Sequence, residues 1–141
     1  MFLIDTDVLS QLAKRRRSRY VEAWFAEQRT AELFVSVVTI GEIERGIVLQ
    51  RRTNPGHASA LAAWIDRTLA VYRDRVLPFD LASARRWGQL SAAVGHEGAD
   101  LQIAATALEH GLTVVTRNVS DFRSTGVAVL NPYDARPPRG R

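Results

Sequence analysis

Short apolar runs alternate with segments of helical periodicity along this chain, and that alternation restricts the fold more than any other feature of the sequence. We expect β-strands at residues 2–4, 33–38, 75–79, 112–116 and 127–130. Helical patterns lie between them, from residue 8 to the basic run at 14–19, then at 20–29, from 40, around 61–69, at 81–94 and at 100–110. Because each crossover between parallel strands must span the sheet, this order predicts an α/β fold, with a mainly parallel central sheet flanked by helices on both faces.

The length of 141 residues is that of one compact domain. We therefore assign residues 1–133 to a single domain. Residues 134–141 are rich in proline, glycine and arginine, and we expect them to form a flexible C-terminal tail. The first apolar run is stopped by Asp5, and no later run approaches the ~20 apolar residues of a membrane span, so we expect a cytoplasmic protein with no membrane segment.

The complete lack of cysteine narrows the possible chemistry. Disulfides, thiolate metal sites and cysteine nucleophiles are all excluded, which leaves carboxylates, histidines and hydroxyls. The three histidines, His57, His96 and His110, are scattered without the spacing of a zinc site. We therefore assign no catalytic role to them.

Acidic residues follow the ends of the expected strands. Asp5 comes directly after the first strand, Glu42 four residues after Val38, and Asp121 five residues after Thr116. The carboxyl ends of parallel strands meet at one edge of a sheet, where ligands bind. Each acid could instead cap a helix or offset its dipole, and residues 39–42 have the sequence of a capping box.

Asp100 is the most informative acid. Apolar residues follow it at helical spacing, so that it shares the buried face of its helix with Ile103, Ala104, Ala107 and Leu108. A carboxylate in that position is costly unless a cation or hydrogen bonds compensate it. Four converging carboxylates would also repel one another and raise their pKa values, so they need positive charge between them.

The chemistry that fits four such acids is hydrolysis of a phosphodiester by metal-activated water. Oxygen ligands without cysteine or paired histidines favour Mg²⁺ or Mn²⁺, and such an ion would lower the pKa of a bound water. We assign Asp5, Asp100 and Asp121 as direct ligands. Glu42 would bind directly or through water and could help to remove the proton. Thr116 and Asn118 could orient the ligands as outer partners.

These residues resemble the PIN-domain family, and within it the VapC toxins of the branch that includes FitB-like proteins. The resemblance covers nearly the whole chain and makes residues 1–133 a PIN-like nuclease domain. It rests on residues 3–10 (LIDTDVLS), 37–43 (VVTIGEI), 100–107 (DLQIAATA), 113–122 (TVVTRNVSDF) and 129–133 (VLNPY). It implies endoribonuclease activity, Mg²⁺ or Mn²⁺ as cofactor, a homodimer, and neutralisation by a VapB-like antitoxin.

Two features depart from the pattern of that branch. Asp7 stands where asparagine is usual; it could bind a metal-bound water as an outer partner or simply begin the helix, and we favour the helix start. Residues 95–99 form a segment about two residues shorter than usual before Asp100, which affects how that acid is placed.

The chain is basic, with a net charge of +4, and Lys14 is its only lysine. A polyanionic partner such as RNA fits this charge. Residues 14–19 could contact RNA phosphates or an acidic segment of the antitoxin, or they could form a solvated loop. Arg117, which lies inside the last acidic motif, is the better candidate for contacting RNA.

Two other functions remain open from the sequence. Residues 4–8 also resemble the D-x-D motif of haloacid-dehalogenase-type phosphatases, in which Asp5 would be phosphorylated. That chemistry needs a lysine well downstream, whereas the chain's lysine is Lys14. The second alternative is a catalytically inactive member of the family that works as a binding or regulatory partner.

Overall fold

The structure is a computed structural model that describes residues 1–134, so the expected tail lies, apart from Asp134, outside the described residues. The strands are β1 (Phe2–Ile4), β2 (Leu33–Ser36), β3 (Val76–Leu77), β4 (Thr113–Val115) and β5 (Val129–Leu130). The helices are α1 (Thr6–Gln11), α2 (Arg19–Glu27), α3 (Val37–Arg51), α4 (Pro55–Tyr72), α5 (Leu81–Val94), α6 (Ala99–His110) and α7 (Val119–Arg123), with short 3₁₀ turns at Thr30–Glu32, Arg73–Arg75 and Pro132–Asp134.

The strands form one sheet in the order β3-β2-β1-β4-β5, and every pairing between neighbours is parallel. The expected α/β fold with a parallel sheet is therefore confirmed. The chain adds β2 and β3 on one side of β1 and then crosses to add β4 and β5 on the other. Such a reversal of strand order opens a crevice beyond the carboxyl ends of the two strands where it occurs, here β1 and β4.

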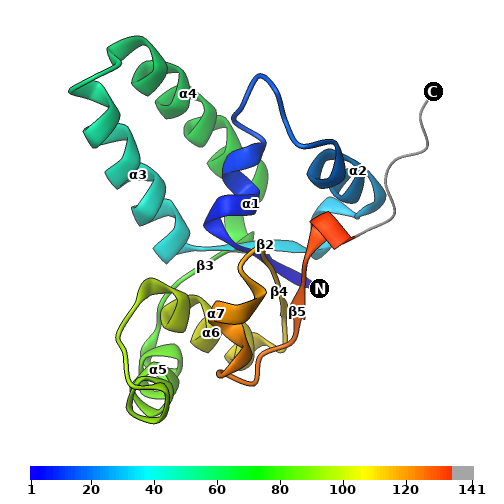
Figure 1. Ribbon diagram of the computed structural model, residues 1–141, viewed down its shortest axis with the longest axis vertical. Coiled ribbons are helices and arrows are strands. Elements are labelled where there is room, and N and C mark those ends of the chain that lie inside the picture. The colour runs from blue at the N-terminus through cyan, green and yellow to red at the C-terminus, as the bar shows by residue number, and fades with distance from the viewer. Residues whose placement is uncertain (135–141) are drawn as a thin grey trace.

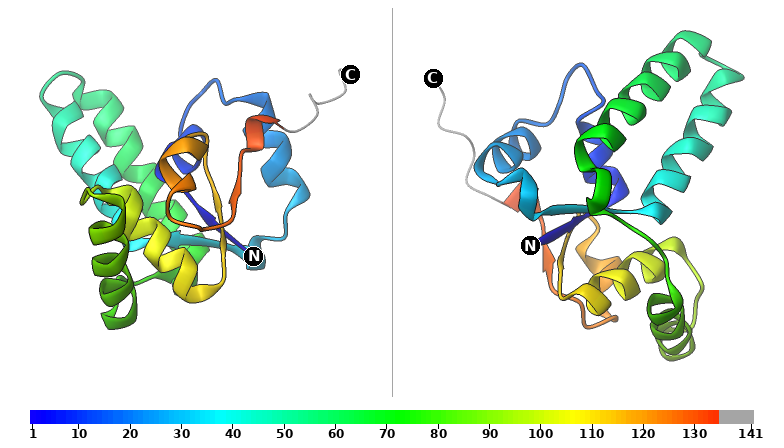
Figure 2. Two further views of the ribbon diagram at one scale, coloured as in Figure 1. Left: turned by 60° about the horizontal axis from the view of Figure 1, so that its bottom comes forward. Right: turned by 180° about the vertical axis from the view of Figure 1, so that it is seen from behind.

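Alternate residues of each strand pack into separate cores on the two faces of the sheet. Ile4 and Val115 belong to the core beneath α1–α4, whereas Leu3 and Val114 belong to the core with α6 and α7. All four side chains are fully buried, as the period of two in a strand requires when both faces are covered. Figures 1 and 2 show α1–α4 on one side of the sheet and α5–α7 on the other.

Helices α3 and α4 form a hairpin that extends beyond the sheet (Figure 1). The turn between them ends at Asn54, whose side chain caps α4 by accepting a hydrogen bond from the backbone of His57, and Pro55 occupies the first turn. Ile43 and Ile47 of α3 are buried together with Ile65 of α4. The hairpin thus holds one wall of the region beyond β1 in place.

The strand expected at residues 33–38 is two residues too long, and the helix expected from residue 40 begins at Val37 instead. Val37 and Val38 favour strands by intrinsic preference. The side chain of Ser36 overrides that preference, because its hydroxyl accepts a hydrogen bond from the Val38 amide and caps α3. Residues 39–42 therefore lie inside the helix, which excludes the alternative that they form a capping box.

The short helix α7 was not expected from the sequence, and it places Asp121 in its first turn. Within residues 1–134, none of the helices combines the length and the apolar character that crossing a membrane requires.

Candidate active site

Asp5 is fixed at the point where β1 passes into α1. Its backbone amide donates to the carbonyl of Val115 at 2.9 Å, which continues the β1–β4 pairing by one residue. Its carboxylate caps α1: Oδ1 accepts from the amide of Thr6 at 2.9 Å. Oδ2 accepts from the hydroxyl of Thr116 at 2.8 Å. The side chain is only 5% exposed, so hydrogen bonds and burial together hold this carboxylate at the sheet edge.

The turn after β4 is tied to the turn after β1. The hydroxyl of fully buried Thr116 accepts from the amide of Asn118 at 3.0 Å while it donates to Asp5. The side-chain amide of Asn118 donates to Oδ2 of Asp7 at 2.7 Å. Asp7 lies in the first turn of α1, where its charge offsets the helix dipole, and it also faces the neighbouring turn.

Glu42 reaches the same region from the second turn of α3. Its side chain is exposed, and Oε1 accepts from the hydroxyl of Thr6 at 2.8 Å. That hydroxyl also lies 3.1 Å from the hydroxyl of buried Thr39. Thr6 and Thr39 are functional candidates that the sequence analysis missed. The available signals were that Thr6 follows Asp5 directly and that Thr39 stands three residues before Glu42, on the same helix face.

Asp100 and Asp121 complete the group from the other side of the sheet. Each lies in the first turn of its helix, α6 for Asp100 and α7 for Asp121. Burial raises the pKa of Asp100, and the charges of Asp121, Glu42 and Asp7 raise it further, while His96 lowers it. The charges of acids from α1, α3 and α7 thus act on the Asp100 carboxylate. Asp100 therefore belongs to the acidic group despite the short loop that precedes it.

Burial raises the pKa of Asp5 to about 6. The hydrogen bonds from Thr116 and Thr6 oppose this rise, and the charges of Asp7 and Asp100 add to it. The structure thus brings all the acids singled out in the sequence into one electrostatic neighbourhood. Ionising them together is unfavourable unless positive charge enters the site.

No ion pair in residues 1–134 supplies that charge to the acids. The salt bridges found there are Arg17–Glu22 and Arg86–Glu109, and neither of them includes an acid of this group. Arg117, which directly follows Thr116, stacks its guanidinium over the ring of Tyr133, 4.8 Å from the ring centroid. The acidic group is therefore not neutralised by the protein's own side chains over the described part of the chain.

As the side chains stand, no three histidine, aspartate or glutamate side chains in residues 1–134 lie close enough to grip a single metal ion. The kind of donor nevertheless fits a metal. Carboxylate oxygens without sulfur or paired imidazoles suit Mg²⁺ or Mn²⁺, and an unneutralised, partly buried acidic group is stabilised by a divalent cation. The site therefore suits a divalent cation in the type of its ligand atoms and in its negative charge, although its side chains are not arranged around one metal position.

Replacing Thr116 by valine tests how Asp5 is held. The change keeps the shape but removes the donor to Asp5 and the acceptor for Asn118, so we expect a loss of about 1–3 kcal/mol in the free energy of unfolding near neutral pH. Urea denaturation measures it. Thr113→Val is the matched control, since Thr113 opens β4, the strand that ends just before Thr116, and its hydroxyl makes no hydrogen bond within residues 1–134. Equal losses in both variants would show that Thr116 does not anchor the carboxylate.

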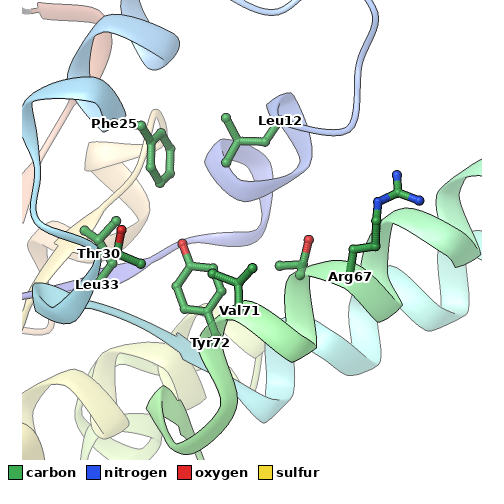
Figure 3. A pocket seen from close by; sticks show the side chains of 8 residues that line it. Leu12, Phe25, Thr30, Leu33, Arg67, Val71 and Tyr72 are labelled. Carbon is green, nitrogen blue, oxygen red and sulfur yellow. The ribbon is translucent and has the colours of Figure 1, made fainter.

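A separate hollow of about 340 Å³ lies between α1, α2 and α4. Leu12 and Phe25 face Val71 and Tyr72 across it (Figure 3). No carboxylate lines this hollow. The acid chemistry of the molecule therefore belongs to the crevice at β1 and β4.

Comparisons with known proteins give consistent findings. The family model described as PIN domain matches residues 2–127. The chain is 34% identical over 149 residues to VapC ribonuclease Y4jK of Sinorhizobium fredii, covering 95% of this chain and 99% of that protein. It is 32% identical over 139 residues to toxin FitB of Neisseria gonorrhoeae, covering 94% and 99%. The crystal structure of FitAcB from Neisseria gonorrhoeae matches with a TM-score of 0.85 and 32% identity, covering 96% of this chain and 100% of that one.

Proposed function

Since this chain belongs to the PIN domain family, we propose that it is a metal-dependent endoribonuclease that serves as the toxin of a toxin–antitoxin pair. The observation that carries the proposal is the group of Asp5, Glu42, Asp100 and Asp121 beyond β1 and β4, unneutralised by any ion pair within the described residues. Relatives named as a ribonuclease and as a toxin support the same class of activity.

The proposed cofactor is Mg²⁺ or Mn²⁺. Asp5, Asp100 and Asp121 would hold it directly, and Glu42 directly or through water. When bound, such an ion supplies positive charge at the phosphodiester and lowers the pKa of a water molecule. The buried environment that raises the pKa of Asp5 also makes its carboxylate a strong partner for a cation, because little solvent competes for it.

The remaining work falls to the chain's own side chains. Thr6 fixes one oxygen of Glu42 while the exposed carboxylate stays open to solvent, so Glu42 is suited to accept a proton from the attacking water. Thr116 keeps Asp5 from rotating away, and Asn118 keeps Asp7 turned toward the site. Arg117, exposed beside these turns, would contact a phosphate of the RNA strand.

The proposed partners are an RNA substrate, a VapB-like antitoxin and a second copy of this chain. Resemblance to the toxin family supports the antitoxin and the dimer, and the basic net charge supports RNA. We propose that the protein acts in the cytoplasm, where cellular RNA is available. Membership of the PIN domain family sets the haloacid-dehalogenase reading aside.

Glu42→Gln tests the role of this carboxylate in cutting RNA. The change keeps size and removes the charge and the proton acceptor, so we expect cleavage of a defined RNA by the purified, antitoxin-free chain to fall by about 10²-fold or more. Glu44→Gln is the matched control, because Glu44 is an exposed acid on the same helix with no part in the acidic group. Equal rates for both variants would remove Glu42 from the reaction. No cleavage even by the unaltered chain would favour an inactive binding partner.

A further inference from the structure

A second hollow opens directly beside the acidic group. It has a volume of about 250 Å³ and lies between α1, α3 and the first turns of α4. Thr6 and Glu42 belong both to its wall and to the acidic group. Whatever occupies this hollow, called here the α1/α3/α4 pocket, therefore lies next to the place where a phosphodiester would be cut.

The room in the α1/α3/α4 pocket comes partly from Gly46. This glycine lies in the middle of α3, where glycine is among the poorest helix formers. Gly46 lines the pocket, and a Cβ atom added to it would meet no other atom within 4 Å. No close packing against a neighbour requires a glycine here. Because Gly46 has no side chain, this part of the pocket wall is open space.

The lining combines apolar side chains with side chains that carry N–H donors. Ala13 in the turn after α1, Ile43 of α3 and Leu61 of α4 supply apolar surface. Lys14, the chain's only lysine, and His57, from the first turn of α4, supply N–H groups. Both are exposed at the surface, so a strand in solution can reach them. Apolar side chains together with N–H donors suit a ring that carries hydrogen-bond acceptors.

The size and charge of the pocket narrow the occupant further. Its volume is below the range of about 300–1,000 Å³ in which drug-sized ligands bind, so it suits one small ring system. Lys14 favours a base with acceptors on its edge, and lysine commonly recognises the O6 and N7 atoms of guanine. The acidic group would bind a phosphodiester only when a cation is present. Because the pocket adjoins this group, a base in the pocket and a phosphate at the acids would belong to neighbouring positions of one RNA strand.

We propose that the α1/α3/α4 pocket binds one nucleobase of the RNA, a guanine, next to the cleaved phosphodiester, and so sets the cleavage sequence. The inference rests on the proposed ribonuclease function, and it adds which position of the RNA the protein would cut. In this arrangement Lys14 and His57 donate to the base edge, and Gly46 provides the room for the ring.

Filling the pocket through Gly46 tests the inference. Gly46→Leu places a side chain in the pocket and improves the helix preference of α3, so the variant is expected to fold. Gly88→Leu is the matched control, since Gly88 lies in α5 on the other side of the sheet and an added Cβ there also meets no atom within 4 Å. Circular dichroism and melting curves establish that both variants are folded.

Cleavage of a library of short RNAs, read by sequencing of the fragments, gives the first readout. The unaltered chain and Gly88→Leu are expected to cut beside guanine. Gly46→Leu is expected to lose that preference and at least about tenfold in kcat/KM on guanine-containing RNA, and Lys14→Ala to lose part of the preference. An unchanged cleavage profile in Gly46→Leu would overturn the inference while leaving the ribonuclease function intact.

A second readout does not depend on cleavage. Fluorescence anisotropy measures the binding of labelled RNA hexamers with and without guanine to an Asp5→Asn background, with and without Gly46→Leu. We expect tighter binding of the guanine-containing RNA, and loss of this difference when the pocket is filled. If filling the pocket leaves RNA binding unchanged but weakens the complex with the antitoxin, the pocket serves a protein partner and the nucleobase inference is wrong.

Discussion

Replacing Asp5 by asparagine is expected to reduce RNA cleavage by at least about 10³-fold and, at the same time, to raise the melting temperature of the metal-free protein at neutral pH. Cleavage falls because the change removes the charge of a carboxylate that two hydrogen bonds hold in the site. Stability rises because the folded chain no longer has to keep that charge in a buried site. Loss of activity together with a gain in stability would show that Asp5 is kept for catalysis and not for folding.

The raised pKa of Asp5 determines how the stability of the folded chain changes with pH. Asp5 has a pKa raised from 3.8 to about 6 in the folded chain. Between these values the folded state retains a proton that the unfolded chain has lost, so stability falls as pH rises through the window and stays lower above it. The full penalty above the window is on the order of 3 kcal/mol. Losing the Thr116 hydrogen bond offsets part of the gain on substitution, since asparagine cannot accept both hydrogen bonds.

Melting curves in chelator, recorded from about pH 4 to above neutral, measure this prediction. The unaltered chain is expected to lose stability as the pH rises through about 4–6. Asp5→Asn is expected to follow a flatter curve and to melt several degrees higher at neutral pH. Asp66→Asn, an exposed acid on α4, is the control and should change neither the melting temperature nor cleavage appreciably. An Asp5→Asn protein that melts lower than the unaltered chain at neutral pH would contradict the account of Asp5.

Divalent metal is expected to reverse the order of stability. Mg²⁺ or Mn²⁺ binds the folded chain and relieves the repulsion among Asp5, Asp100 and their neighbours, so the melting temperature should rise with metal concentration. At about one hundred times Kd the gain is about 2.7 kcal/mol. Asp5→Asn lacks a proposed ligand and should show only a small shift, so that the unaltered chain becomes the more stable of the two.

Differential scanning calorimetry with increasing MnCl₂, at constant ionic strength, separates binding from general screening by salt. A matched series in NaCl is the control and should leave the melting temperature nearly unchanged. If millimolar Mg²⁺ and Mn²⁺ also leave the melting temperature of the unaltered chain unchanged, the acidic group does not bind these ions.

The sequence predicted the sheet and the identity of the acids because both depend on local pattern. Apolar runs of strand length, separated by helical periodicity, gave a parallel sheet with its acids at the strand ends, and the structure brings Asp5 and Asp100 into one electrostatic neighbourhood. The start of α3 was misplaced because a single hydroxyl, that of Ser36, decides it against the strand preference of the two valines that follow.

Features that depend on distant residues could not be predicted. The contact between Asn118 and Asp7 joins residues 111 positions apart, and the hydrogen bond from Thr6 to Glu42 joins two separate helices. The pocket beside Gly46 exists only because α1, α3 and α4 meet around it. No periodicity within one segment carries that information, since it arises from how the segments pack.

The most direct test of the central claim is the cleavage of total RNA by the purified, antitoxin-free chain in Mg²⁺ or Mn²⁺ and in chelator. The account predicts discrete fragments with metal, none in chelator, and their return when excess Mn²⁺ is added back. Fragments that form equally well in chelator, or a folded chain that cuts no RNA under any of these conditions, would contradict it.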